Sequence, residues 1–268
     1  MTILNRDIYN KCINHYNEIS GISFVVRNAI PIPFFGDVER YLKSPRRILT
    51  AALNPSGREF PQSKPARFDV REGRAKPEAL ERTLSDYFER HPYRAWFGAF
   101  EHVLNGLDAT YGGKMSNGEF SCTALHIDIC SPVATDPTWS RLLPEQRAVL
   151  TPFGSEIFFQ IIKELRPSLI IASMGWSHLF AFHPALIGGR AWPRIAEYTT
   201  TGGGGLLKSP LWLQVGLVSF DETKVLFANA SAANTPFGRF TNGRKWETGE
   251  KLHRYLQLIE VQESLSCS

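Results

Sequence analysis

Polar side chains follow several apolar runs of this chain, at the points where buried strands would end. Asn54 comes directly after the apolar run at 48–53, and Asp128 ends a second run. Asn229 and Ser231 follow a third. Because the carboxyl ends of parallel strands lie along one edge of a sheet, these groups would converge there, where α/β folds place their ligands. The alternative is that they are ordinary turn and helix-capping residues.

The elements that would position these residues alternate between strands and helices. Apolar runs predict strands at 48–53, 122–129, 169–174, 213–220 and 224–228, the last two forming a hairpin or strand pair. Helical spacing predicts helices at 7–19, 36–42, 76–90, 91–107, 144–165, 176–182 and 248–259. This alternation is typical of a single α/β domain over 1–268 with a mostly parallel sheet and an irregular N-terminal part.

Two glycine- or proline-containing stretches read as loops. The stretch at 56–76 is polar and basic, so a long loop is expected there. The segment at 199–205 has the sequence TTTGGGG. It lacks the Lys-Ser/Thr ending and the following helix of a phosphate-binding loop, so a flexible loop is the better interpretation.

Composition sets broad limits on function. The chain has 268 residues and a formal net charge of +4, which permits an acidic partner such as nucleic acid without requiring one. None of the four cysteines forms a Cys-x-x-Cys pair, so we expect neither a zinc nor an iron–sulfur site, and no cofactor. The first residues do not resemble a signal peptide, and no apolar run is long enough to span a membrane. We therefore expect a cytoplasmic protein with free thiols.

The order of the motifs resembles the uracil-DNA glycosylase superfamily, in particular its mismatch-specific and single-strand-selective branches. Those branches have a Gly-x-Asn-Pro-Gly motif after the first strand, where this chain has Ala52-Leu53-Asn54-Pro55-Ser56-Gly57. A His/Asn-Pro-Ser loop follows their last strand, where this chain has Asn229-Ala230-Ser231. Between the two, a base-reading side chain corresponds to Asp128, and a Pro-Glu-led helix corresponds to the one beginning at Pro144. The resemblance covers roughly residues 45–245.

The resemblance implies a fold and a reaction. The fold would be a three-layer α/β/α sandwich with a central, mostly parallel four-stranded sheet. The reaction would be hydrolysis of the N-glycosidic bond of a flipped-out base by a monofunctional, monomeric DNA glycosylase, leaving an abasic site. Ala52 and Ala230 depart from the family pattern, in which a glycine and a proline shape these turns.

The resemblance also assigns the two catalytic candidates. Asn54 would position the attacking water, a geometric role because an amide is a poor base. Asp128 would read the base, where the family often has Asn. An ionised carboxylate only accepts hydrogen bonds, so it would suit the amino group of a cytosine better than uracil. If burial raised its pKa, Asp128 could instead donate to the departing base. Capping of the following turn is the competing interpretation.

Further side chains would hold the base. Phe68 is the expected stacking platform and Phe60 its alternate, although both could be core packing. His126 lies two residues before Asp128 on the same side of the strand, and a buried, hydrogen-bonded histidine is the simpler interpretation. Asn229 and Ser231 are the remaining base-binding candidates.

The DNA-binding candidates cluster around both outer motifs. Six basic residues lie between Arg58 and Lys76, and more follow the last motif. The DNA-binding set is Arg58, Ser231, Asn234, Phe237, Arg239, Arg244 and Lys245, with Phe237 as a wedge into the base stack. Solvated loops and packing at the turn are the alternatives.

These observations favour a DNA glycosylase acting on a cytosine derivative in defence against phage. A uracil or mismatch repair glycosylase is the nearest alternative. A catalytically inactive nucleic-acid-binding module would keep the basic loops and tolerate the motif changes. A nucleoside or nucleotide hydrolase could use the same strand-end geometry.

Overall fold

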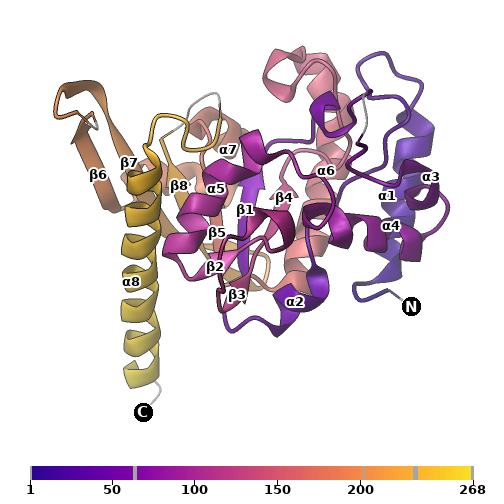
Figure 1. Ribbon diagram of the computed structural model, residues 1–268. Helices are drawn as coiled ribbons and strands as arrows, with labels where there is room; N and C mark the ends of the chain where they lie inside the picture. The colour runs from indigo at the N-terminus through magenta and orange to yellow at the C-terminus, as the bar shows by residue number, and fades with distance from the viewer. Residues whose placement is uncertain (1, 63–64, 202, 232–234, 267–268) are drawn as a thin grey trace.

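A six-stranded sheet runs through the centre of the molecule (Figure 1). The computed structural model describes residues 2–62, 65–201, 203–231 and 235–266. Across the sheet the strands are β4 (Leu125–Asp128), β1 (Ile48–Ala52), β5 (Leu169–Ala172), β8 (Thr223–Ala230), β7 (Leu206–Phe220) and β6 (Arg194–Thr200). The first four are mutually parallel, while β7 is antiparallel to both β8 and β6. The expected parallel four-stranded sheet is therefore present, but two antiparallel strands extend it.

The central strands are buried on both faces, which explains why they read as continuous apolar runs in the sequence. Every residue of β1, β4 and β5 is buried. By contrast, β6 alternates, with Ala196 and Tyr198 buried between exposed or half-buried neighbours. This short alternation escaped the sequence analysis.

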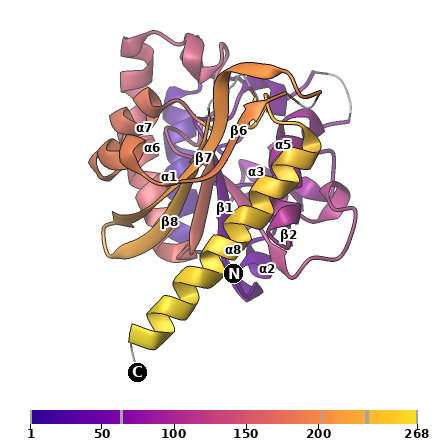
Figure 2. The same cartoon turned by 90° about the vertical axis from the view of Figure 1, so that its left-hand side faces the viewer.

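Helices cover both faces of the sheet (Figure 2). The helices α6 (Pro144–Leu165) and α7 (Trp176–Phe182) lie on one side, and α5 (Arg94–Gly106) and α8 (Asn242–Ser266) lie on the other. The close approach of α5 to α8 requires glycine, because a Cβ on Gly106 would lie 2.2 Å from the carbonyl oxygen of Trp246. This arrangement of layers agrees with the expected sandwich architecture.

Smaller elements surround this core. The helix α1 (Arg6–Ile19) contacts α6 through an ion pair of 2.9 Å between Lys11 and Glu156. The remaining short elements are α2 (Val38–Lys43), α3 (Val70–Gly73), α4 (Pro77–Ser85), β2 (Ala109–Thr110) and β3 (Cys122–Thr123), with the 3₁₀ turns η1 (Gly57–Glu59), η2 (Asp86–Phe88), η3 (Gly113–Met115), η4 (Trp139–Arg141) and η5 (Pro184–Ala191).

Most predicted elements are confirmed, and the differences have local causes. The run at 122–129 is split at Ala124, because β3 pairs with β2 in a separate sheet while β4 joins β1. The predicted hairpin is formed by β7 and β8, with Asp221 at a left-handed φ of 51° in its turn. The loop at 56–76 contains η1 and α3. The first two residues of the TTTGGGG segment, Thr199 and Thr200, end β6, and Thr201 and Gly205 are hydrogen-bonded to each other before β7 begins.

Three further observations concern the described residues alone. None of their helices combines the length and apolar character needed to span a membrane. Cys12, Cys122 and Cys130 are buried and not disulfide-bonded. Among the same residues, no three His, Cys, Asp or Glu side chains gather closely enough to hold a metal ion.

Candidate active site at the carboxyl edge of the sheet

The sheet register brings the polar strand ends together in two neighbouring pairs. Ala52 of β1 is the register partner of Asp128 of β4, so Asn54 follows β1 on the edge at which Asp128 ends β4. Ala172 of β5 is in turn the partner of Asn229 of β8. Because β1 also pairs with β5, all these groups lie along one edge, as expected from the sequence.

The turn that carries Asn54 is held in place by the chain after β4. The amides of Ile129 and Cys130 donate to the carbonyl oxygens of Ala52 and Leu53 at 2.9 and 2.8 Å. Further along, the amide of Gly57 donates to the carbonyl oxygen of Thr135 at 3.1 Å. The backbone around Asn54 is therefore fixed from both ends, as a site needing precise geometry requires.

The side chain of Asn54 has one orientation that satisfies its neighbours. Its Nδ2 donates to the Oγ1 of Thr135 at 2.9 Å and lies 3.4 Å from the carbonyl oxygen of Val133. A carbonyl oxygen only accepts, so the amide nitrogen must face Val133. The Oδ1 atom accepts no hydrogen bond from the part of the chain that the structure describes. Since Asn54 is half-buried, this oxygen is able to accept a hydrogen bond from a water molecule.

Asp128 is a buried carboxyl group with an unpartnered oxygen. It is 8% exposed, and its Oδ1 makes no hydrogen bond with any described residue, although the Nε2 of His126 lies 3.7 Å away. Burial raises the pKa of Asp128, and the neighbouring His126 offsets part of that rise. A protonated Asp128 offers one hydrogen-bond donor and one acceptor, unlike the ionised group considered from the sequence.

His126 is a packed, hydrogen-bonded histidine. It is 1% exposed, and its Nδ1 lies 2.7 Å from the Oγ1 of Thr50, which also contacts the hydroxyl of Tyr111. The rings of Phe35 and Phe97 lie 5.5 and 5.1 Å from the imidazole. The structure favours the buried-histidine interpretation, with the Nε2 of His126 lying 3.7 Å from Asp128.

A second buried carboxyl group, that of Glu59, was missed by the sequence analysis. Glu59 is 5% exposed, accepts a hydrogen bond of 2.6 Å from the hydroxyl of Tyr87, and lies 4.0 Å from the Nε of Arg67. Burial is the main cause that raises its pKa to about 7, and the negative charge of Asp128 adds to the rise. Glu59 stands among basic residues of a polar loop, so its sequence context indicated a solvated charge.

The two candidate stacking rings are placed differently from expectation. Phe68 is 3% exposed, and its ring stacks against those of Phe60 and Tyr87, with centroids 5.4 and 4.9 Å away. Phe60 is only half-buried. The preference for Phe68 is therefore corrected: Phe68 is packed in the core, and Phe60 is the ring with surface to offer a base.

Asn229 serves the backbone rather than a ligand. It is completely buried, its Oδ1 accepts from the amide of Met174 at 3.1 Å, and its Nδ2 donates to the carbonyl oxygen of the same residue at 3.2 Å. These bonds join the chain after β5 to β8. With both amide atoms occupied, Asn229 does not fit the expected base-binding role.

Ser231 is likewise part of the strand framework. Its amide donates to the carbonyl oxygen of Trp212 on β7 at 3.0 Å, and its Oγ accepts from the amide of Trp212 at 3.4 Å. Its carbonyl oxygen also accepts from the Oγ of Ser173. The geometry supports neither a base-binding nor a DNA-binding role for the Ser231 side chain.

The expected wedge into the base stack is also contradicted. Phe237 is fully buried, with its ring 5.9 Å from that of Phe100 and 5.3 Å from that of Phe240. Its amide donates to the Oγ of Ser173 at 3.0 Å. Phe237 thus packs the last loop onto α5, which was the alternative interpretation. Asn234 lies outside the described residues.

The basic candidates divide into available and occupied groups. Arg58 and Arg239 are exposed, and they donate to the hydroxyl of Tyr93 and the carbonyl oxygen of Ser209, respectively. Arg244 instead donates to carbonyl oxygens at the end of β6. Lys245 is half-buried, and burial lowers its pKa. Arg58 and Arg239 therefore remain the better DNA-binding candidates.

No protein-family model matches the chain, and no curated protein matches it either. What the site can do is therefore inferred from its own chemistry. It combines an oriented amide oxygen with a buried acid whose oxygen has no partner among the described residues, both at one edge of the sheet.

Proposed function

We propose that this protein is a DNA glycosylase of the uracil-DNA glycosylase type. It hydrolyses the N-glycosidic bond of a flipped-out pyrimidine and leaves an abasic site. The observation that carries the proposal is that Asn54 and Asp128 lie at the ends of neighbouring strands and each keeps an oxygen available. The Oδ1 of Asn54 is left as an acceptor, and the buried Oδ1 of Asp128 has no partner among the described residues. The order of the surrounding motifs supports it.

Cleavage of the bond between C1′ and the base builds positive charge on the sugar and negative charge on the base. The enzyme must place a water molecule behind C1′ and stabilise the departing base. In this proposal the Oδ1 of Asn54 accepts a hydrogen bond from that water and directs its lone pair at C1′. As the C1′–O bond forms and the C1′–N bond breaks, the proton released by the water is taken up by the departed anionic base, which leaves as a neutral molecule. The contribution is one of orientation, since an amide removes protons poorly.

Asp128 acts in its neutral form on the departing base. Because burial raises the pKa of this carboxyl group, the proton is retained to higher pH than in water, and the O–H donates to the base as it gains negative charge. A neutral acid can donate to the O4 of uracil, or accept from the amino group of cytosine. The preference for cytosine inferred from an ionised Asp128 therefore holds only above its raised pKa.

The proposal extends to mode of action and biological role. No lysine stands at 52–57, 125–128 or 229–238, so no Schiff base forms there and the strand is left uncut by the enzyme. We propose a monomer acting in the cytoplasm. Release of a modified cytosine would assign it to defence against phage, and release of uracil would assign it to repair.

The test is mass spectrometry of the bases released from several genomic DNAs, including phage DNA with hypermodified cytosines. Released base with matching alkali-sensitive breaks is the expected result. DNA binding without any released base would reject the glycosylase and leave an inactive binding module. Faster hydrolysis of free nucleotides than of DNA would assign the site to a nucleotide hydrolase.

The role of neutral Asp128 is tested by the pH dependence of base choice. As pH rises through its raised pKa, Asp128 loses its donor, and the rate ratio of cytosine-derivative to uracil release is expected to rise severalfold, since about 1.4 kcal/mol gives a tenfold ratio. In Asp128→Asn the ratio should stay flat and favour uracil. A ratio measured on one enzyme cancels changes in DNA binding. If a folded Asp128→Asn variant showed the same dependence of this rate ratio on pH as the wild-type protein, Asp128 would not be the residue that selects the base.

A further inference from the structure

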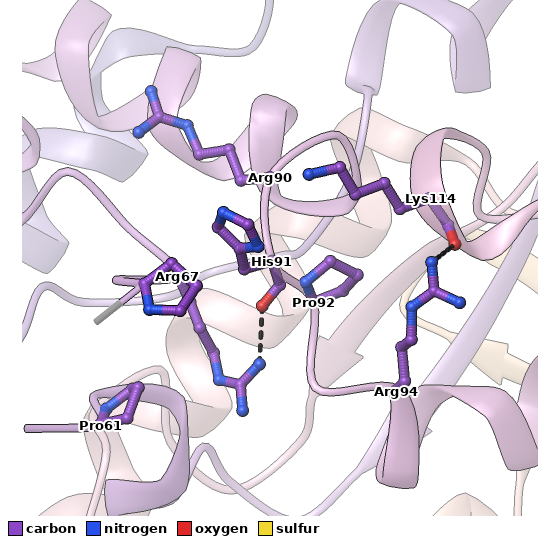
Figure 3. A pocket seen from close by; sticks show the side chains of 8 residues that line it. Pro61, Arg67, Arg90, His91, Pro92, Arg94 and Lys114 are labelled. Carbon is purple, nitrogen blue, oxygen red and sulfur yellow. Dashed lines mark hydrogen bonds between the residues drawn. The ribbon is translucent and has the colours of Figure 1, made fainter. Parts of the chain in front are cut away.

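A basic hollow of about 420 Å³ lies where the chain around Arg67 meets the start of α5 (Figure 3). Three parts of the described chain form it: Pro61 with residues 65–67, the junction of η2 with α5, and η3. Its lining residues are Pro61, Pro65, Arg67, Arg90, His91, Pro92, Arg94 and Lys114. The hollow was not anticipated from the sequence, where only Arg67 belonged to a recognised basic stretch.

Positive charge exceeds negative charge around this hollow. Its cations are Arg67, Arg90, Arg94 and Lys114. Glu89 lines an adjoining part of the hollow and lies 4.0 Å from Arg40, and Asp86 lies 3.6 Å from Arg90. Asp86 partly balances Arg90, and Glu59, 4.0 Å from Arg67, partly balances that cation. No acidic side chain of a described residue forms an ion pair with Arg94 or Lys114.

The cations are held in place by neutral partners. Arg67 donates to the carbonyl oxygen of His91 at 2.6 Å and lies over the ring of Tyr93 at 5.0 Å. Arg94 donates to the carbonyl oxygen of Lys114 (Figure 3). Carbonyl oxygens and rings orient a guanidinium without neutralising it. Fixed cations suit a phosphate group, because less side-chain entropy is lost on binding, and Arg94 has no acidic partner among the described residues.

Lys114 and the start of α5 add to the attraction for an anion. The Lys114 ammonium makes neither a hydrogen bond nor an ion pair with any residue that the structure describes. In Figure 3 its side chain extends toward the loop at His91. The helix α5 begins at Arg94 with no acidic residue in its first turn and no capping side chain, so its positive end is not compensated.

Arg67 links the hollow to the candidate site. Its Nε lies 4.0 Å from Glu59, whose pKa responds to the charge of Asp128. Its guanidinium also donates to the carbonyl oxygen of Arg58, the exposed DNA-binding candidate.

We propose that this hollow binds a backbone phosphodiester of the nucleic-acid strand beside the flipped nucleotide. This inference rests on the proposed function, which supplies the strand. The contact between the hollow and this phosphate would hold the strand in register while the base occupies the site. The cations come from three separate segments of the lining.

Lys114→Gln provides the cleanest test, because it removes a charge without removing a described contact, and Lys114→Glu reverses the charge. The matched control is Lys224→Gln, an exposed lysine at the start of β8 on the opposite edge of the sheet. The probe is a fluorescent single-stranded oligonucleotide, titrated at several salt concentrations in an Asn54→Ala background that prevents turnover. Inorganic phosphate is titrated separately as a competitor.

We expect Lys114→Gln to weaken binding about threefold to tenfold and to reduce the slope of log K against log salt by about 0.7, the value for one single-strand phosphate contact. Lys114→Glu should weaken binding further, and Lys224→Gln should match the background protein. Equal affinity and slope in all variants would overturn the inference. Displacement of the oligonucleotide by millimolar inorganic phosphate would do the same, because it would identify a site for a free phosphate.

Failure of this inference can be told apart from failure of the proposed function. Charge-dependent strand binding by a protein that releases no base would leave the hollow as inferred and reject the glycosylase. Base release by wild-type protein, with binding unaffected by the Lys114 substitutions, would keep the glycosylase and reject the hollow.

Discussion

The two halves of the carboxyl edge use the same residue types for different purposes. On the β1–β4 half, Asn54 and Asp128 each keep an oxygen free of hydrogen bonds to the described residues. On the β5–β8 half, Asn229 has both amide atoms bonded to Met174, and Ser173 ties the last loop down. An asparagine near the end of a strand can therefore bind a ligand or hold neighbouring backbone in place. Which of the two it does depends on whether backbone groups already form hydrogen bonds with its amide atoms.

Buried carboxyl groups show the same division. Glu101 is buried, but its oxygens accept hydrogen bonds from Asn105, Thr110 and the amide of Tyr111, so it stabilises α5 and β2. Asp128 has an oxygen without such a partner at the ligand edge of the sheet. Buried polar groups are normally satisfied, so the unpartnered oxygen makes Asp128 a better candidate for function than Glu101.

In the β5–β8 half, the largest expected loss of stability is that of Phe237→Ala. Removing a fully buried ring that packs on Phe100 and Phe240 should lower the free energy of unfolding by about 3–5 kcal/mol. Denaturant unfolding measures this, with Phe237→Leu as a milder control. If Phe237→Ala kept its stability but lost DNA binding, Phe237 would act as the wedge into the base stack. The β5–β8 half would then contact DNA and would not be purely structural.

Glu59→Gln should change the pH dependence of stability. Glu59 has a pKa of about 7 when folded against an ordinary value of 4.5, so the unfolded chain loses its proton first. The free energy of unfolding therefore falls as pH rises from about 4.5 to about 7, by about 3 kcal/mol, and stays lowered above that range. Glu59→Gln, which keeps an acceptor for Tyr87, should remove this fall.

Urea unfolding at pH 5 and pH 8 measures the difference. The exposed Glu222 in the turn between β7 and β8 offers a matched control, and Glu222→Gln should keep the wild-type dependence. If the stability of Glu59→Gln fell with pH as much as that of the wild-type protein, burial of Glu59 would not be the cause of the fall.

The sequence predicted placement along the chain better than it predicted contacts. The strand end at Asn54 was visible because an apolar run stops at a polar turn, and α6 was visible from its periodicity and Pro144. Burial of Glu59 was not visible, since it depends on Tyr87 and Arg67 from separate segments.

The roles of the two strand-end asparagines were equally hidden. Asn54 and Asn229 both follow apolar runs. Only the structure reveals that both amide atoms of Asn229 form hydrogen bonds with the backbone of Met174. The ring exposed to a ligand was also misjudged, because Phe60 and Phe68 lie in the same loop and differ only in how other rings cover them.

The most direct test of the account compares base release per folded molecule in Asn54→Ala and Asn229→Ala. Asn54→Ala should lose about 100-fold or more in base release, as when an oriented catalytic amide is removed, while its unfolding free energy falls by only about 1 kcal/mol. Asn229→Ala should lose about 2–4 kcal/mol of stability, because buried polar groups of Met174 are left unsatisfied, yet keep near-wild-type release when folded. Near-normal release by Asn54→Ala, or loss of release by folded Asn229→Ala, would contradict the assignment of chemistry to the β1–β4 half.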